Sequence, residues 1–567
     1  MADPAGAVRG YAGSVTGPLS DLREAVVVAS GAVAVAGAGG GSSAAPTLER
    51  PKKADFGDYA TNAAMLLAPR AGVPPRDVAG QLAGKLEQLL GASLERVEIA
   101  GPGFLNLFLS DGWYVTALAH VLTAGEAFGA GSADPAERVN VEFVSANPTG
   151  PMTAAGGRHA AFGDSLARLL EFAGHAVTRE FYINDMGGQV RRLGESIQAR
   201  ACGEEVPEGG YHGDYVTELA EHIPGAESDD VGVVAARGVQ LLLENIRASM
   251  SAIGVEFDVW FSERSLHTGD PSAVRHAFEE LDKRGETYRS EGALWLRTTA
   301  HGEQKDDVLE RSTGAPSYLA SDIAYHLNKR ERGFDRLIDV WGADHHGHVA
   351  RLHAAFEALG APAGQLELII MQFVNVIEHG ERAQMSKRRG DFVTLDELLA
   401  QIGADAARFF MLQRSHDTTV DLDLDLAREQ SNENPVYYVQ YAHARIASIL
   451  KKAGAASVEP AVGAAAGFTG VLEPAERTLV KKLLAFPDEV AEATERRAPH
   501  RIAAYGIELA QTFTAFYRDC QVLGAEGEGV EAFRLALSVA TKRTIARSLD
   551  LLGVSAPEQM AREPQPS

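Results

Sequence analysis

The sequence predicts an α/β protein in three parts, and three observations support this. Strand-like and helix-like runs alternate over 137–430, which is typical of a parallel sheet with helices on both faces. From 431 onwards strand-like runs cease, and apolar residues recur every three to four positions, as in amphipathic helices. Before 135, a helix-like run precedes two strand-like runs separated by Gly-Pro-Gly, which predicts a small α+β module.

The boundaries of these parts are expected near residues 120 and 430. The stretch at about 195–300 is more polar than its surroundings and is expected to be a helical insertion. The apolar run at 25–41, AVVVASGAVAVAGAGGG, ends in a glycine-rich stretch and follows an acidic N-terminal stretch. A secretory signal has a basic start, so we interpret this run as a short element followed by a linker, with the signal as the alternative. No apolar run reaches the length of about 18 residues that a membrane span needs.

Composition narrows the possible classes of protein. The chain has 567 residues, 45% of them hydrophobic and 23% charged, which is the balance of a multidomain globular protein. A net charge of −24 argues against a non-specific nucleic-acid coat protein, although a local basic track stays possible. Cys202 and Cys520 give neither a disulfide framework nor a zinc-finger spacing. Low cysteine usage fits a reducing compartment, so a cytoplasmic protein is expected.

A turn rich in Gly and Pro joins a strand-like run to a helix-like run. RVNVEFVS ends at Ser145, ANPTGPMTAAGGR follows at 146–158, and a helix-like run comes next. Ligands of open α/β sheets bind beyond the carboxyl ends of strands, and the N–H groups that begin a helix attract phosphate. A bare turn of this kind is more often structural than a nucleotide site, so this pattern alone does not settle its role.

A basic loop follows much later in the chain. RAQMSKRRGDF, at 382–392, carries Lys387, Arg388 and Arg389 on an otherwise acidic protein. Such a loop can clamp a triphosphate and stabilise the departing pyrophosphate by its charge. The alternative is an ordinary solvated basic loop, which is the commoner origin of a charge run.

Together these two stretches resemble the paired signatures of class I aminoacyl-tRNA synthetases. Further segments resemble the arginyl-tRNA synthetases in particular, over nearly the whole chain from about 47 to 560. These segments are GDYATN, VEFVSANPTGP, REFYINDMGGQV, SYLASDIAYHLNKRERGFDRLIDVWGADHHGHVARL, QMSKRRGDFVTLDELLAQIGADAARFFML, DLDLAREQSNENPVYYVQYAHAR and LDLLGVSAPEQM.

The resemblance implies a function and a domain plan. It implies ATP-dependent activation of L-arginine to arginyl-adenylate, then transfer to the 3′ end of tRNA(Arg), with Mg²⁺ accompanying ATP and with activation needing bound tRNA. Residues 1–120 would be an additional domain that touches the tRNA elbow. Residues 121–430 would be a Rossmann-type catalytic domain, and 431–567 a helical anticodon-binding domain. The family implies a monomer.

The resemblance also assigns an arginine site. Glu142, Tyr318 and Asp322 match positions that hold the guanidinium, and Asn147 and Asp344 match positions near the α-amino group. A guanidinium has five donors, so carboxylates and hydroxyls suit it. Alternation in VNVEFV places Glu142 on the polar face of its strand, and a surface carboxylate is the alternative interpretation.

The first signature departs from the family pattern. Where relatives carry His-x-Gly-His, this chain reads Thr153-Ala154-Ala155-Gly156. Losing one such charge-stabilising donor costs on the order of 10²–10³ in rate, unless Arg158 or His159 substitutes. The second signature has Gln384 at its first basic position but retains the next residues. The expected catalytic residues are Met385, Ser386 and Lys387, and the expected ATP-binding residues are Pro151, Thr153, Gly156, Gly157, Arg158, His159 and Arg388.

The remaining candidates concern tRNA and metal. Tyr438 and Tyr441 match anticodon-facing positions, with core aromatics as the alternative, because unpaired RNA bases stack on aromatic rings. Met560 is a further anticodon candidate, and Phe104 and Asn106 are candidates for the tRNA elbow. DHHGH at 344–348 invites a zinc interpretation, but no cysteine lies nearby and no metal site is expected.

Three functions fit this sequence. The first is an arginine–tRNA ligase, slow if the altered signature is not compensated. The second is a synthetase-like paralogue that binds tRNA or arginine without charging, or that passes an activated amino acid to another acceptor. The third is an adenylate-forming enzyme without tRNA, which the helical bundle and the elbow-like module disfavour.

Overall fold

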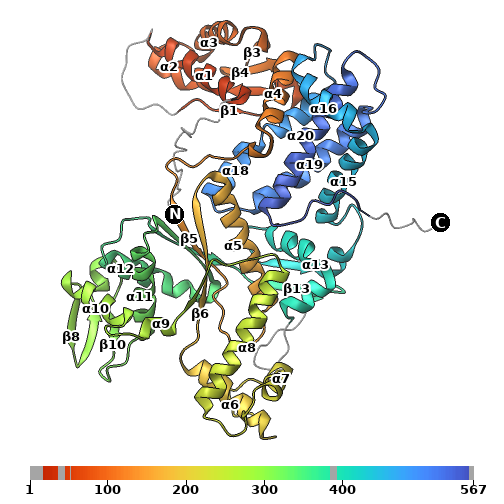
Figure 1. The fold of residues 1–567 in the computed structure, drawn as a ribbon. Helices are drawn as coiled ribbons and strands as arrows, with labels where there is room; N and C mark the ends of the chain where they lie inside the picture. The colour runs from red at the N-terminus through yellow and green to blue at the C-terminus, as the bar shows by residue number, and fades with distance from the viewer. Residues whose placement is uncertain (1–16, 36–44, 52, 383–392, 561–567) are drawn as a thin grey trace.

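The computed structural model describes residues 17–35, 45–51, 53–382 and 393–560. A small N-terminal module lies beside a helical bundle, and a parallel sheet with two excursions lies below them (Figure 1). No helix in the described ranges is long and apolar enough to cross a membrane.

The N-terminal module packs helices on one antiparallel sheet. Its strand order is β1-β2-β4-β3, and β3 and β4 form the hairpin that the two strand-like runs predicted. Leu105, Leu107 and Leu109 of β4 face the core and are fully buried. The elements are α1 (Pro18–Val35), β1 (Leu48–Glu49), β2 (Tyr59–Thr61), α2 (Ala63–Ala71), α3 (Pro75–Leu90), β3 (Leu94–Ala100), β4 (Phe104–Leu109) and α4 (Asp111–Ala124).

The central domain contains a five-stranded parallel sheet of order β12-β11-β5-β6-β7, which confirms the predicted α/β class. The chain runs outward from β5 in one direction and later returns to β11 on the other side of β5. The carboxyl ends of β5 and β11 therefore flank a switch point, where ligands of such sheets bind. The elements are β5 (Arg138–Glu142), α5 (Ala154–Ala173), β6 (Ala176–Ile183), β7 (Val259–Ser262), α11 (Tyr318–Glu331), β11 (Arg336–Gly342), α12 (Val349–Ala358) and β12 (Leu366–Met371).

The structure differs from the expected helical insertion at about 195–300. β7 lies inside this range and pairs with β6, so the stretch is two excursions separated by a sheet strand. β7 is a half-buried edge strand of four residues, VWFS, which is too short to show a strand pattern of its own. The first excursion is α6 (Gly188–Ala201), α7 (Asp214–His222) and α8 (Val231–Ala252). The second contains α9 (Arg264–His267), α10 (Ala273–Lys283) and the antiparallel strands β8 (Thr287–Ser290), β9 (Ala293–Leu296) and β10 (Asp307–Glu310).

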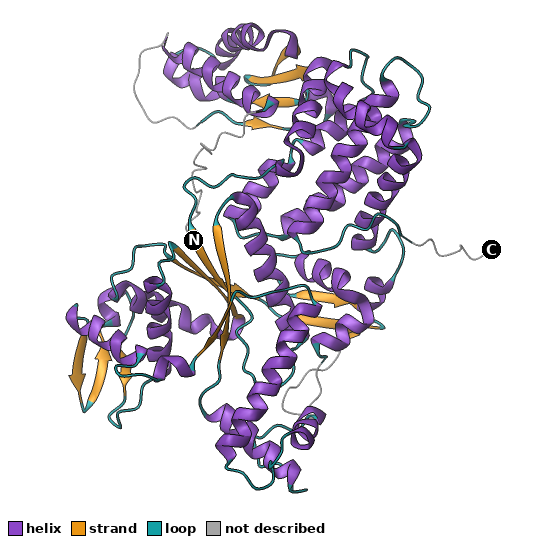
Figure 2. Ribbon diagram, viewed as in Figure 1, coloured by secondary structure: helices purple, strands orange, loops and turns teal. Residues whose placement is uncertain are grey.

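The C-terminal part is a helical bundle, as expected (Figure 2). A three-stranded sheet of order β14-β13-β15 precedes it. These strands and the helices beside them are β13 (Val374–Glu378), β14 (Glu381–Arg382), α13 (Leu395–Leu412), β15 (Val420–Asp423) and α14 (Leu424–Arg428). The bundle comprises α15 (Pro435–Ala453), α16 (Ala455–Ala464), α17 (Pro474–Leu483), α18 (Phe486–Glu495), α19 (His500–Asp519) and α20 (Val530–Leu551).

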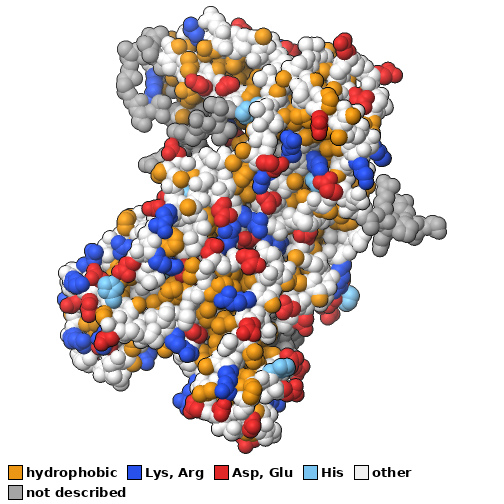
Figure 3. Space-filling view, viewed as in Figure 1, with side chains coloured by type: hydrophobic (Ala, Val, Ile, Leu, Met, Phe, Trp, Pro, Cys, Tyr) orange, Lys and Arg blue, Asp and Glu red, His pale blue; other side chains and the backbone are white. Residues whose placement is uncertain are grey.

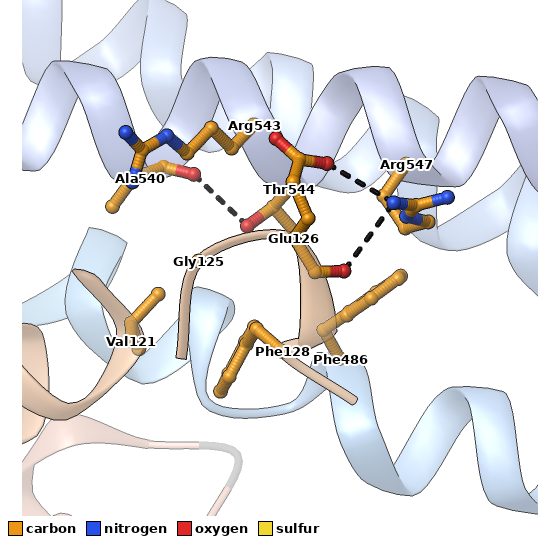
Figure 4. Close-up of a pocket in the computed structure, with 9 residues that line it drawn as sticks. All are labelled: Val121, Gly125, Glu126, Phe128, Phe486, Ala540, Arg543, Thr544 and Arg547. Atoms are coloured by element: carbon orange, nitrogen blue, oxygen red, sulfur yellow. Dashed lines mark hydrogen bonds and ion pairs between the residues drawn. The ribbon is translucent and has the colours of Figure 1, made fainter. Parts of the chain in front are cut away.

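The bundle contacts both other parts. A small pocket lies where the segment after α4 meets α18 and α20 (Figure 4). There the rings of Phe128 and Phe486 stack with centroids 6.1 Å apart, and Arg547 donates to the Glu126 carboxylate at 3.0 Å. Basic and acidic side chains are interspersed on the face of the molecule in Figure 3.

A buried charged cluster joins the bundle to the catalytic domain. Arg408 of α13 is fully buried and donates to Asp164 of α5 at 2.5 Å, and its Nε donates to the Leu552 carbonyl, after α20, at 2.8 Å. Arg168 and Arg179 also pair with Asp164. Helix α5, which begins at the Gly- and Pro-rich turn, is thereby fixed to the end of the bundle.

Candidate active site

The end of β5 is strained where it enters the Gly- and Pro-rich turn. Val144 has φ 74° and Ser145 has φ 39°, a left-handed conformation that is unfavourable for a β-branched residue. Such conformations persist only where neighbours enforce them, and they cluster at functional sites. Ser145 Oγ donates to Glu142 Oε1 at 2.6 Å, which ties this bend to the strand before it.

The turn is hydrogen-bonded to the residues that directly follow the basic loop in the sequence. Thr153 caps α5, with its hydroxyl accepting from the Gly156 N–H at 3.3 Å. The Ala154 N–H donates to the Val393 carbonyl at 3.2 Å, and the Leu395 N–H donates to the Met152 carbonyl at 2.8 Å. The residues that follow the basic loop are thus anchored to the first signature. Met385, Ser386, Lys387 and Arg388 lie outside the described residues.

Two glycines in the first turn of α5 lie close against neighbouring side chains. A Cβ atom at Gly156 would lie 2.2 Å from Met152 Sδ, and one at Gly157 would lie 2.7 Å from Leu395 Cδ1. The Met152 side chain therefore occupies the space that a side chain at 156 would need. Pro151, the last residue before Met152, is half-buried.

The two residues expected to compensate for the missing histidines differ in surroundings. The guanidinium of Arg158 donates to four backbone carbonyls, those of Gln372, Phe373, Ser415 and Thr418. With this side chain only 1% exposed, the structure does not bring Arg158 to a nucleotide. His159 Nδ1 is buried and has no hydrogen-bond partner in the described part of the chain. Burial, together with the nearby Arg158, lowers the pKa of His159 to about 4, so its imidazole is neutral at pH 7.

The first two turns of α11 bring together two expected arginine ligands. Tyr318 is 59% exposed at the start of the helix, and Asp322 follows one turn later. His348 Nε2 lies 2.7 Å from Asp322 Oδ2, and the rings of Tyr318 and His348 meet edge to face at 5.7 Å. A carboxylate and a phenol are therefore presented side by side near the end of β11.

Glu142 is buried, which excludes the interpretation as a surface carboxylate. Its Oε2 accepts from Lys329 Nζ at 2.6 Å and its Oε1 from Ser145 at 2.6 Å. Burial raises the pKa of Glu142, against the opposing effect of Lys329. Asn147 is half-buried further along the turn, and the Asp344 side chain, after β11, is 76% exposed.

Sequence reasoning missed Glu263, which belongs to the same acidic group. Burial, followed by the charges of Asp322 and Asp185, raises the pKa of Glu263 to about 7. Burial raises the pKa of the phenols of Tyr182 and Tyr318, and the charges of Glu263, Asp322 and Glu142 raise it further. Glu263 directly follows the carboxyl end of β7, so recognising that strand in the sequence would have predicted it. The arrangement suits a ligand that carries a cation with several donors.

Metal binding has no support in the described ranges. They hold no cluster of three or more His, Cys, Asp or Glu side chains arranged to bind a metal ion. In the DHHGH segment the rings of His345 and His348 instead pack against Trp341, at 5.7 and 5.8 Å.

The candidates for tRNA contact fall into three places. Tyr441 stacks on Tyr437 at 6.0 Å and accepts from Arg445 at 3.0 Å, whereas the Tyr438 hydroxyl donates to Thr514 at 3.2 Å. Met560 is half-buried after the last helix. Phe104 is 38% exposed at the start of β4, whereas Asn106 is only 4% exposed, so the structure does not present its side chain to solvent.

Comparison with known proteins agrees with this architecture. Residues 117–201 and 225–447 match the class I tRNA synthetase (R) catalytic domain. Residues 22–109 match the arginyl tRNA synthetase N-terminal domain, and 439–560 match the DALR anticodon-binding domain. The match to this catalytic domain, on a parallel sheet that is followed by such a bundle, identifies the chain as a class I aminoacyl-tRNA synthetase.

Similar proteins narrow the class further. The arginine–tRNA ligase of Carboxydothermus hydrogenoformans is 44% identical over 90% of this chain and 94% of its own. That of Desulforudis audaxviator is 46% identical over 91% and 93%. The structure of Thermus thermophilus arginyl-tRNA synthetase superposes with a TM-score of 0.73, at 25% identity, covering 95% of this chain and 100% of that one. The chain belongs to the arginyl-tRNA synthetase family.

Proposed function

We propose that this chain is an arginine–tRNA ligase, which activates L-arginine with ATP and transfers it to the 3′ end of tRNA(Arg). The observation that carries this proposal is the pairing of the Tyr318 phenol and the Asp322 carboxylate around His348 near the end of β11, with Glu263 close enough to interact with both. A guanidinium is the cation that such carboxylates and phenols bind best. Relatives with the same domain plan, which bear the name arginine–tRNA ligase, support the same conclusion.

Each domain has a part in this function. Class I enzymes use ATP. We propose that Pro151, Thr153, Gly156, Gly157 and His159, at the turn before α5 and at the start of α5, contact the ATP. Mg²⁺ would enter bound to the ATP phosphates. The part before residue 120 would contact the tRNA elbow through Phe104. The bundle after 430 would contact the anticodon through Tyr441 and its neighbours. We propose a monomer that acts in the cytoplasm, where tRNA is charged.

The altered signature supports a second candidate, a paralogue that binds its ligands without charging. The Thr153 hydroxyl is used to cap α5, and Met152 fills the space beside Gly156. Because the hydroxyl accepts in this cap, its O–H can still donate one hydrogen bond, but neither position offers the ATP phosphates an imidazole donor. His159 is neutral and can contribute a hydrogen bond but no charge.

Charging of total tRNA with labelled arginine, ATP and Mg²⁺ separates the two candidates. The wild-type chain is expected to charge tRNA, and the variant Met152→Ala/Thr153→His/Gly156→His is expected to do so about 10²-fold faster, because two preorganised donors are restored. Met152→Ala is included because its side chain blocks position 156, and Met152→Ala alone is the matched control. Charging by the restored variant only would favour the paralogue. Charging by neither would contradict the proposed function.

A further inference from the structure

Three carboxylates lie side by side on one face of the central sheet. Glu142 of β5 is register-paired with Glu180 of β6 on one side and with Asp339 of β11 on the other. Glu180 and Asp339 are fully buried, and Glu142 is 4% exposed. Like charges opposite one another on neighbouring strands destabilise a sheet, and buried carboxylates need partners. This row therefore depends on cations from another element.

Helix α11 and Arg332, the residue that directly follows it, supply these cations. Lys329 Nζ, fully buried, lies 2.6 Å from Glu142 Oε2 and 2.8 Å from Asp339 Oδ1. His326 Nε2 lies 2.7 Å from Asp339 Oδ2, and Arg332 binds both Glu180 oxygens at 2.8 and 2.9 Å. Three basic groups thus meet three carboxylates. Lys329 is the one that bridges two of them.

The face of α11 that carries Lys329 also carries the arginine ligands. Tyr318 and Asp322 precede Lys329 by about three and two helical turns, so they lie along one side of α11. The ion pairs at the C-terminal half of α11 therefore set where Tyr318 and Asp322 lie relative to β5. Glu142 extends this chain of contacts, because its other oxygen accepts from Ser145 in the strained bend that leads to the turn before α5.

We propose that Lys329 is a positioning residue for both substrates. Through Asp339 it fixes α11 and its arginine ligands, and through Glu142 and Ser145 it fixes the turn that receives ATP. Glu142 then acts as the link between Lys329 and this turn. This inference rests on the proposed function.

The first test compares arginine binding to full-length wild type, Lys329→Met and Lys283→Met by titration calorimetry between pH 6 and 8. Lys329→Met is expected to weaken arginine binding at least about tenfold, because small misplacements of binding groups are costly. It should also change the pH dependence of arginine affinity from that of the wild type, since Glu142 and Asp339 then compete for a proton beside Glu180, His326 and Tyr325. Lys283 is exposed on α10 and serves as the control.

The second test uses Ser145→Ala, which leaves the buried charges intact. It is expected to raise the KM for ATP, or to lower kcat, by about tenfold with an unchanged melting temperature. If Lys329→Met fails to fold, Lys329→Met/Asp339→Asn replaces it, because this variant removes one charge of each sign. Arginine affinity within twofold of wild type in the folded Lys329 variant would overturn the proposal, as would unchanged kinetics of Ser145→Ala. Absence of arginine binding by the wild type would instead contradict the proposed function.

Discussion

Replacing Glu263 by Gln or Asp322 by Asn is expected to lower kcat/KM for arginine by about 10²-fold or more. Each substitution keeps the shape of the side chain and removes one negative charge from a partly desolvated site. Removing one partner of a buried, hydrogen-bonded charge pair costs about 2–5 kcal/mol, and each 1.4 kcal/mol corresponds to roughly tenfold. The KM for ATP should change little. Steady-state charging with varied arginine measures the effect.

The pH dependence of arginine binding follows from Glu263. Because the pKa of Glu263 is raised to about 7, this carboxyl is half-protonated at neutral pH in the free enzyme. A bound guanidinium favours the carboxylate, so binding releases the proton. Arginine affinity is therefore expected to be full above pH 7 and to fall as the pH decreases below 7, by up to about tenfold per pH unit. Glu263→Gln should abolish this dependence.

The control for these substitutions is Glu279→Gln, because Glu279 is exposed on α10 and lies outside the site. It should leave the kinetics and their pH dependence unchanged. If Glu263→Gln kept both the wild-type KM for arginine and its pH profile, Glu263 would not belong to the arginine site.

Replacing Asp164 by Asn is expected to lower the free energy of unfolding by about 3–5 kcal/mol, because it leaves Arg408 as an uncompensated buried charge. Arg408 has no exposed surface, and it joins α5 to α13 and to the end of α20. Thermal and urea unfolding of the purified chain measure the change. The kcat/KM for ATP should also decrease, since α5 begins at the turn that we propose to bind ATP.

Acidic pH should diminish the difference in the free energy of unfolding between the wild type and Asp164→Asn. Burial would raise the pKa of Asp164, but the guanidinium groups of Arg408, Arg168 and Arg179 hold it below its usual range. The stabilisation is therefore present above about pH 4, the unfolded-state value, and is lost as the pH falls through the lower folded-state pKa. Arg168→Met is the control: this side chain is 31% exposed, so its loss should cost at most about 1 kcal/mol. Equal effects of the two substitutions would contradict the special role of Arg408.

The local patterns of the chain predicted most of the fold. Alternating runs predicted the parallel sheet, and spacing of three to four residues predicted the bundle, because burial of apolar faces imposes these periods. β7 escaped detection because an edge strand of four residues is too short to show such a pattern. Glu263 was missed for the same reason, because its position after the end of a strand can be recognised only once that strand is known.

The sequence by itself determined the family, the order of the parts and the positions of Tyr318 and Asp322, because motif residues and periodicity are local properties of the chain. Only the tertiary structure decided what the buried groups do. In the tertiary structure, Arg158 donates to backbone carbonyls, and Met152 occupies the space that a second histidine would need. Lys329 pairs with Glu142 and Asp339. These contacts connect segments far apart in the chain, and their geometry arises from packing, which no local pattern records.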